Sequence, residues 1–284
     1  MTAAGRAGVF RWTPSTPCDD SCVPDRDREP VVALGVQLRR WLALAGVFVL
    51  AVPVSWLLPL LPKRIRERLA SSGARGILWA LGIRVVAADV PPRRGPALLV
   101  GNHISWLDGL VLLAREPLHQ VAKSEIRDLP VFGGLAARAG TVFIERDRLS
   151  TLPATIAEMR DRLAAGISVA VFPEGTTRCA VAGVVLRPAS FQAALDAGVP
   201  VRPVRLEFRG PDGRPSAAAA FLGEEDVLTS LRRVIRAGGL SVHLREGATI
   251  WPRTVRDRRE FAARAQAEIL GGATVPVPEL KVAA

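Results

Sequence analysis

The chain has 284 residues, enough to bury one ordinary hydrophobic core with peripheral additions. It carries a formal net charge of +11, almost all of it from arginines dispersed along the sequence. There is no tyrosine and no basic-aromatic sheet motif of the RNA-binding kind, so we expect no nucleic-acid partner. Anionic membrane lipids or a phosphorylated substrate fit the charge better, because each Lys or Arg near an anionic leaflet contributes about 1 kcal/mol.

The first 30 residues are rich in Pro, Ser, Asp and Arg and lack apolar periodicity, which predicts a disordered tail that we extend over residues 1–40. The apolar run that follows begins too late for a signal peptide. Cys18 and Cys22 have no histidine partner, so we expect no metal site there. Together with Cys179 they do not form a disulfide framework, which favours a reducing, cytoplasm-facing location.

Residues 41–62 contain no charged side chain, and a run of this length nominally spans a bilayer. Pro53 and Pro59 interrupt the run. The unbroken part, Trp41–Val52, would be only about 18 Å long against a hydrocarbon core of about 30 Å. A kinked span and an insertion into one half of the membrane are both compatible with this pattern.

The next segment, residues 63–81, has apolar residues near helical spacing and an Arg-rich opposite face, which is typical of an interfacial amphipathic helix, although Gly73 and Gly76 weaken it. We therefore treat residues 41–81 as a membrane-associated helical segment. It forms either a hairpin in one leaflet or a single transmembrane helix followed by a basic stop. In both alternatives the basic residues after Pro62 favour the cytoplasmic face of the cell membrane for the rest of the chain.

From residue 82 onward, short apolar strands alternate with helical patterns. The expected strands are 83–87, 97–100, 119–122, 141–144, 167–172, 201–206 and 240–244, and the expected helices are 106–114, 131–138, 152–165, 189–197, 228–236 and 255–270. This alternation predicts an α/β fold with a mixed, largely parallel sheet flanked by helices, built as a single domain from residues 82–284.

His103 and Asp108 lie in a turn between a predicted strand and a predicted helix, where an open α/β sheet presents its chemistry. Their spacing lets the carboxylate reach one imidazole nitrogen and leaves the other free to take a proton from a substrate hydroxyl. We interpret the pair as a general base and the residue that orients it. Ser105 is the nearest rival nucleophile, but it lacks a Gly-x-Ser-x-Gly elbow, so we do not expect a covalent serine mechanism.

Three more segments, 143–146, 172–176 and 199–203, place polar, Gly or Pro residues at the ends of predicted strands. With His103 and Asp108 they form four blocks that resemble, in order, the glycerolipid acyltransferase family, in particular the lysophospholipid acyltransferases that form phosphatidic acid. The resemblance covers roughly residues 96–206. It implies transfer of a fatty acyl group from acyl-CoA or acyl carrier protein to a lysophospholipid, with 1-acyl-glycerol-3-phosphate as the first candidate and no metal or covalent cofactor.

The resemblance also implies acceptor-binding residues. Arg146 matches the Arg that binds the acceptor phosphate, and a guanidinium can hold phosphate oxygens in bidentate fashion. Lys123, at the end of its strand, is a second candidate cation. Glu174 is expected to accept hydrogen bonds from hydroxyl or amide groups of the acceptor, and Gly175 to let the backbone approach the ligand closely. Thr176 completes this set of substrate-binding candidates.

Two departures from the family pattern lie near the expected acceptor pocket. Arg178 stands one place later than the Arg of the usual Glu-Gly-Thr-Arg-Ser sequence, and Arg187 replaces the Lys that is common before the following helix. Another lysolipid, such as a lyso-ornithine lipid or a glycolipid, is therefore an alternative acceptor. A non-catalytic membrane-binding protein with the same fold is an alternative of another class, and the presence of the histidine and both carboxylates argues against it.

Overall fold

The computed structural model describes Cys18 and residues 29–87, 95–146, 148–179, 184–222 and 225–271. The strands are β1 (Arg84–Ala87), β2 (Leu98–Gly101), β3 (His119–Lys123), β4 (Val142–Ile144), β5 (Val169–Val171), β6 (Val201–Arg209) and β7 (Ser241–Glu246). They form one seven-stranded sheet in the order β1-β7-β6-β2-β5-β3-β4. Every neighbouring pair is parallel except β6 and β7, which are antiparallel. The fold class predicted from the sequence is confirmed.

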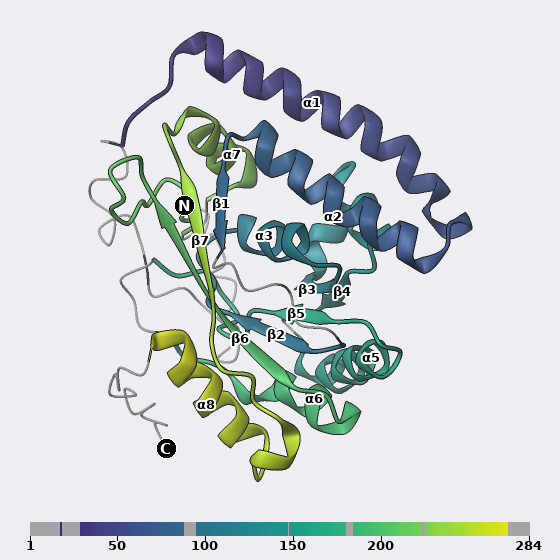
Figure 1. The fold of residues 1–284 in the computed structure, drawn as a ribbon. Coiled ribbons are helices and arrows are strands. Elements are labelled where there is room, and N and C mark those ends of the chain that lie inside the picture. Colours follow the sequence, from purple (N-terminus) through teal and green to yellow (C-terminus); the bar gives the residue numbers. More distant parts are fainter. Residues whose placement is uncertain are drawn as a thin grey trace, which may run out of the picture.

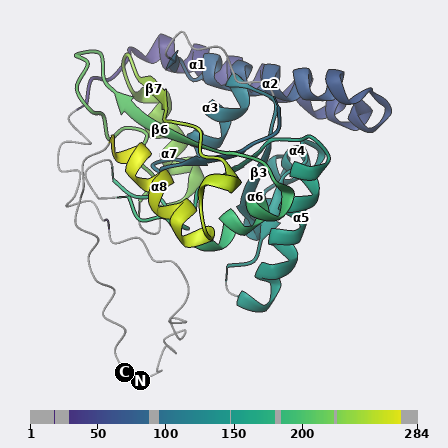
Figure 2. The same cartoon turned by 60° about the horizontal axis from the view of Figure 1, so that its bottom comes forward.

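Helices cover both faces of the sheet (Figure 1). In chain order they are α1 (Leu34–Leu57), α2 (Lys63–Ala80), α3 (Leu107–Arg115), α4 (Phe132–Arg138), α5 (Leu152–Ala164), α6 (Phe191–Ala197), α7 (Val227–Arg236) and α8 (Arg258–Leu270). Short 3-10 turns are η3 (Leu58–Leu60), η4 (Ser124–Asp128), η5 (Leu149–Thr151), η6 (Pro188–Ser190) and η7 (Pro252–Thr254). Figure 2 shows α1 and α2 on one side of the molecule and α5, α6 and α8 on the other.

The central strands are buried on both faces, which explains their near-continuous apolar sequences. Leu99, Ala170 and Val204 belong to the core beneath α2 and α3. Leu98 and Val169 belong to a second core, beneath α5, α6 and α8. Because β2, β3, β4 and β5 run in the same direction, their carboxyl ends meet at one edge of the sheet, and this edge carries the predicted site.

Most predicted elements are present with ends shifted by a few residues. The last helix begins at Arg258 instead of Val255, because residues 252–254 form η7 and the Asp257 side chain caps the helix by accepting from Arg259 N at 2.8 Å and Glu260 N at 2.9 Å. Strand β6 continues to Arg209, three residues past its expected end, because its antiparallel pairing with β7 extends that far.

The predicted end of the disordered tail at residue 40 is wrong, because α1 already begins at Leu34. Cys18, also expected in that tail, is buried with its Sγ 3.3 Å from that of Cys179. Of residues 1–28, the others lie outside the described part of the chain.

Pro53 lies inside α1 without ending it, so the prediction that the helix breaks there is also wrong. A proline removes one backbone donor, and the turns on either side hold the helix together. At 24 residues α1 is about 36 Å long, and with η3 it is long and apolar enough to cross a membrane by length and composition. The glycines of α2 do not interrupt that helix, and Gly76 faces α1, where a Cβ would make an ordinary contact with the Val47 side chain at 3.5 Å.

Helix α1 is attached to the rest of the domain near both of its ends. The buried Arg40 guanidinium donates to Ile235 O at 2.8 Å and to Ala237 O at 2.7 Å. Further along α1, Phe48 packs on Phe132 with ring centroids 5.2 Å apart. Apolar side chains on the outer side of α1 and η3 remain exposed, namely Leu34, Leu38, Leu42, Val49, Leu50, Trp56, Leu57 and Leu60. Helix α1 therefore lies along its domain with an apolar side turned outward.

Replacing Arg40 with Ala should release the first turns of α1 from the domain. Two hydrogen bonds from a charged donor are lost, each contributing about 1.5–3 kcal/mol, and two carbonyl oxygens lose these donors. We expect a free energy of unfolding lower by about 3–6 kcal/mol, and faster proteolysis within residues 34–50, both measured in detergent. Arg39→Ala, at the neighbouring exposed position, is the matched control. Equal stability of the two variants would contradict the anchoring role of Arg40.

Candidate active site

The turn between β2 and α3 brings His103 and Asp108 into contact, as their spacing predicted. His103 Nδ1 lies 2.9 Å from Asp108 Oδ2. Asp108 is fully buried in the first turn of α3, where the same oxygen also accepts from Ile104 N at 2.7 Å and Ser105 N at 2.9 Å. A carboxylate fixed by two backbone donors holds the imidazole with its proton on Nδ1. Nε2 is then the nitrogen that can accept a proton.

One face of the His103 ring is covered by Phe172, which follows β5. The two rings are stacked at 14° with centroids 4.4 Å apart. Gly101 makes this possible, because a Cβ at that position would lie 2.9 Å from a ring carbon of Phe172. The His103 side chain keeps 16% of its surface exposed, so the ring is partly accessible while its orientation is fixed.

Glu174, in the loop after the neighbouring strand β5, stabilises the same turn. Its Oε1 accepts from His103 N at 2.8 Å, and its Oε2 lies 3.1 Å from Arg178 Nε. Arg178 N in turn donates to His103 O at 2.8 Å. Glu174 is only 3% exposed, and both of its oxygens face protein groups. This geometry differs from the expectation that Glu174 meets the acceptor, and it indicates that the residue positions the histidine.

Burial raises the pKa of Glu174 to about 7. The hydrogen bond from His103 N and the charge of Arg178 lower the pKa, but they only partly offset the burial, and the nearby charge of Asp108 raises it further. The carboxyl group that holds the histidine turn therefore changes its charge near neutral pH.

The other residues of the third block form a tight turn. Gly175 has φ +76°, which suits glycine, and its N–H donates to Phe172 O at 3.1 Å. Thr176 is partly exposed beside it. The Thr177 hydroxyl donates to Phe221 O, while Phe221 N donates to Ile104 O at 3.0 Å. A loop that follows β6 is thereby attached to both the histidine turn and the Glu-Gly turn.

Lys123 and Arg146 lie at the same edge of the sheet as His103, at the ends of other strands. Lys123 ends β3 opposite Ile144, the last residue of β4, and Arg146 follows two residues later. Strand β5 lies between these strands and β2. The structure therefore groups the two cations with each other, and an acceptor that meets both these cations and His103 has to extend along the edge. Arg148, further along the chain, is exposed and forms a salt bridge with Glu145 at 3.8 Å.

The residues that hold the histidine turn through contacts with segments far away in the sequence were not predicted. The Asn102 side chain donates to Leu206 O at 3.0 Å and accepts from Leu206 N at 2.8 Å, which joins the end of β2 to β6. Asn102 stands next to His103 in the sequence, but its partner lies 104 residues away. An asparagine beside a catalytic candidate carries no local signal for such a contact.

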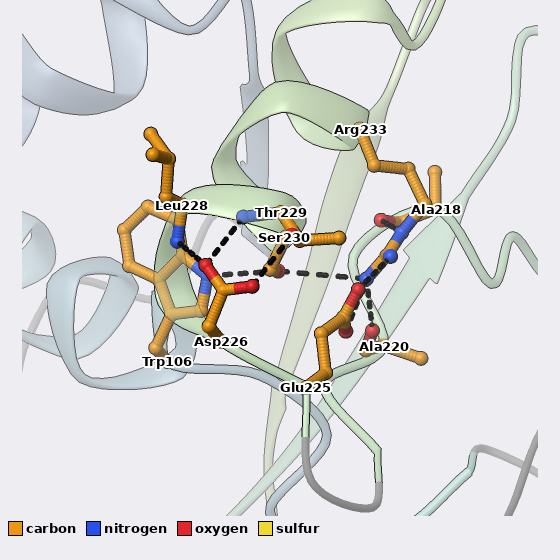
Figure 3. A network of polar contacts seen from close by, with 9 residues as sticks. All are labelled: Trp106, Ala218, Ala220, Glu225, Asp226, Leu228, Thr229, Ser230 and Arg233. Carbon is orange, nitrogen blue, oxygen red and sulfur yellow. Dashed lines mark hydrogen bonds and ion pairs between the residues drawn. The ribbon is translucent and has the colours of Figure 1, made fainter.

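A second set of missed contacts lies around α7 (Figure 3). Trp106 Nε1 donates to Ser230 Oγ at 3.1 Å. Arg233 donates to Ala218 O at 2.9 Å and to Ala220 O at 2.6 Å, and it also pairs with Glu225. These bonds fix the loop after β6 against the histidine turn. The Asp226 side chain caps the start of α7 by accepting from two backbone N–H groups. This N-cap precedes the helix start that the sequence predicted at residue 228.

Comparisons with known proteins point to one enzyme family. Residues 82–207 match the family model described as Acyltransferase. A lyso-ornithine lipid O-acyltransferase of Pseudomonas aeruginosa is 36% identical over 83% of this chain and 86% of its own length, and one of Brucella abortus is 30% identical over 79% and 90%. A 1-acyl-sn-glycerol-3-phosphate acyltransferase of Neisseria meningitidis is 31% identical over 63% of this chain and 70% of its own.

A solved structure shares the fold. The 1-acyl-sn-glycerophosphate acyltransferase of Thermotoga maritima matches with a TM-score of 0.59 at 22% identity, over 84% of this chain and 94% of that one.

The raised pKa of Glu174 predicts how stability depends on pH. Between pH 4.5 and about 7 the folded state keeps a proton that the unfolded state has released, so the free energy of unfolding falls as pH rises through this window. The slope approaches about 1.4 kcal/mol per pH unit. Glu174→Gln lacks this titration. Denaturation at several pH values should therefore show the parent losing stability relative to Glu174→Gln from pH 5 to 7, and parallel curves would contradict the assignment.

Proposed function

The chain belongs to the acyltransferase family, and from this premise we propose that His103 is the general base for transfer of a fatty acyl group to the hydroxyl of a lysolipid. The observation that carries the proposal is the 2.9 Å contact between His103 and a buried, doubly anchored Asp108. The pair lies at the carboxyl end of β2, where the sheet presents substrate-binding loops.

The proposed reaction is a direct transfer. The acceptor oxygen attacks the thioester carbonyl carbon while His103 Nε2 takes the hydroxyl proton, and Asp108 stabilises the imidazolium that forms. The carbon–sulfur bond then breaks, and the departing thiolate receives the proton from the imidazolium. The products are an ester and a thiol. Ser105 is fully buried and its Oγ accepts from Leu107 N at 3.3 Å, which supports the acceptor hydroxyl as the nucleophile.

The donor in this proposal is a thioester, either acyl-CoA or acyl carrier protein, because a thiolate leaves readily and carries its acyl group in activated form. Neither a metal nor a covalent cofactor is required, since the histidine supplies the proton transfer and the acceptor supplies the nucleophile. A non-catalytic relative with the same fold is disfavoured by the intact contacts among His103, Asp108 and Glu174.

For the acceptor we propose a lyso-ornithine lipid. Two relatives with that name match 83% and 79% of this chain, whereas the Neisseria 1-acyl-sn-glycerol-3-phosphate acyltransferase matches 63%. Arg178, which stands one place later than the Arg of the usual Glu-Gly-Thr-Arg-Ser sequence, pairs with Glu174. The second candidate is 1-acyl-glycerol-3-phosphate, supported by Lys123 and Arg146 at the same sheet edge. Because a guanidinium binds carboxylate and phosphate alike, Arg146 suits either head group.

We also propose that the enzyme works on the cytoplasmic face of the cell membrane, with α1 and α2 as a hairpin in one leaflet. The exposed apolar side chains of α1 would enter the acyl region, and the exposed Arg64 and Arg68 of α2 would meet the lipid head groups. Because α1 is attached to the domain along its length, the hairpin keeps the site close to the membrane surface.

His103→Ala should lower turnover about 10² to 10⁴-fold, the usual range for loss of a general base, with donor binding nearly unchanged. The assay uses purified membranes, labelled acyl-CoA or acyl carrier protein, and a panel of lysolipids that includes both candidate acceptors. His243→Ala, a partly buried histidine in β7, is the matched control and should stay close to the parent. If the His103 variant kept more than half of the parent activity, the acid–base assignment would be wrong.

Arg146→Ala should raise KM for the acceptor and leave KM for the donor near the parent value, because the lost charge-assisted bonds belong to the acceptor head group. Steady-state kinetics with each substrate varied in turn measures this. Arg148→Ala, whose exposed side chain pairs with Glu145, is the control and should change neither constant. Unchanged acceptor kinetics in the Arg146 variant would remove this residue from the head-group site.

A further inference from the structure

Val131 has an unusual backbone conformation. It joins η4 to α4 with φ 65° and ψ −51°, and it is the only residue other than glycine with positive φ in the described part of the chain. Phe132 N donates to Pro130 O at 2.7 Å, which makes residues 130–132 a γ-turn of the rare, strained hand. A β-branched residue is poorly suited to this conformation, and such strain is often retained for function.

Neighbouring contacts hold the strained turn rigidly. Gly133 packs directly against the backbone of Arg127, since a Cβ there would lie 1.9 Å from Arg127 O, and Gly133 N donates to Leu129 O at 2.9 Å. The Arg127 guanidinium lies 4.5 Å from the centre of the Phe143 ring in β4. The turn therefore presents its side chains in a fixed direction, and Val131 is left 54% exposed and Leu129 36% exposed.

The turn lies beside the outer helix α1. Phe132, the residue after Val131, contacts Phe48 of α1, and Arg138 at the end of α4 stacks on Trp56 with 3.9 Å between guanidinium and ring centre. Trp56 is itself exposed, as are Leu57 and Leu60 that follow it. The apolar tip of the turn is thus next to the exposed apolar side chains of α1 and η3, which we propose to contact the membrane.

Charged side chains flank this apolar tip, with the cations in excess. Lys123 before η4 and Arg127 within it are exposed, and Arg138 at the end of α4 is partly buried, while η4 also carries the exposed carboxylates of Glu125 and Asp128. An apolar tip with basic residues around it matches a leaflet of anionic lipids, because the side chains enter the acyl region while the cations meet the head groups. Leu129 and Val131 stand six and eight residues after Lys123, so the tip is close in sequence to the candidate head-group site.

We propose that residues 129–131 form a second lipid-contact element, which inserts into the same leaflet as α1 and brings the carboxyl ends of β3 and β4 to the membrane surface. Through it, an acceptor lipid would pass from the bilayer to Lys123 and Arg146 without crossing water. The inference rests on the proposed function in taking a membrane lipid as the acceptor. Contact between the tip and the bilayer is nevertheless measurable without any reaction.

The first experiment measures the depth of the tip in the full-length protein. A polarity-sensitive NBD label is attached at Val131→Cys in a Cys22→Ser background, in which the buried Cys18 and Cys179 are retained. Arg256→Cys, whose side chain is 91% exposed at the opposite side of the sheet, is the matched control. With vesicles of phosphatidylcholine and phosphatidylglycerol, the label at 131 should shift to shorter wavelength and be quenched by brominated lipids, whereas the label at 256 should not change.

The second experiment uses Val131→Gly, which removes the apolar side chain and relieves the strain. Its Tm should equal or exceed that of the parent, since glycine accepts positive φ. KM for an acceptor embedded in vesicles should rise about tenfold, which corresponds to loss of one buried valine side chain, while KM for a short-chain, water-soluble acceptor should not change. Val131→Ile keeps an apolar side chain and should behave like the parent.

Four outcomes decide the proposal. A label at residue 131 that stays in water while the protein is bound to vesicles and active would overturn the proposal. An equal loss of activity of Val131→Gly on soluble and embedded acceptors would also overturn it, because it indicates a structural role. If Val131→Gly lost activity only with acyl carrier protein as the donor, the proposal would be overturned, and the tip would be a docking surface for that protein. Penetration of the label without acylation of any lysolipid would support the lipid contact while rejecting the proposed function.

Discussion

The site depends on the burial of one carboxylate. Asp108 is withdrawn completely from water, and an isolated ionised carboxylate in that position would be strongly unfavourable. Three donors compensate it, namely the His103 ring and the N–H groups of Ile104 and Ser105. Its place in the first turn of α3 adds the partial positive charge of the helix N-terminus. All three bonds fall on Oδ2, while the buried Oδ1 has no hydrogen-bond partner among the described residues. The bonds to Oδ2 shape the turn and select the imidazole nitrogen that remains available for chemistry.

Distant segments then keep that turn in place. Glu174 comes from the loop after β5, Asn102 connects the turn to β6, and the loop after β6 donates to Ile104 O. Each bond crosses between neighbouring elements of the sheet edge, so the orientation of His103 is set by the packing of the whole edge. Preorganisation of this kind lets a single histidine act without reorganising its surroundings during the reaction.

The sequence predicted those features whose signals are local. Apolar runs ended by polar or Gly residues identified β2 and β5, and the spacing from His103 to Asp108 anticipated their contact across one helical turn. The role of Glu174 was not predictable in this way, because its two partners come from a turn 71 residues away and from the displaced Arg178. The length of α1 was also misjudged, because Pro53 removes one backbone donor from the helix without ending it.

The placement of β1 has a consequence for the order in which the molecule can be completed during synthesis. Residues 84–87 are made early, yet the strand that pairs with them in the sheet is β7, at residues 241–246. A nascent chain therefore carries its first strand unpaired while most of the domain emerges, and sequence separation of this size slows folding. The apolar α1 and the amphipathic α2 are already available during that interval. Early contact of these two helices with the bilayer would hold the chain at the surface where it will work, before its sheet is closed.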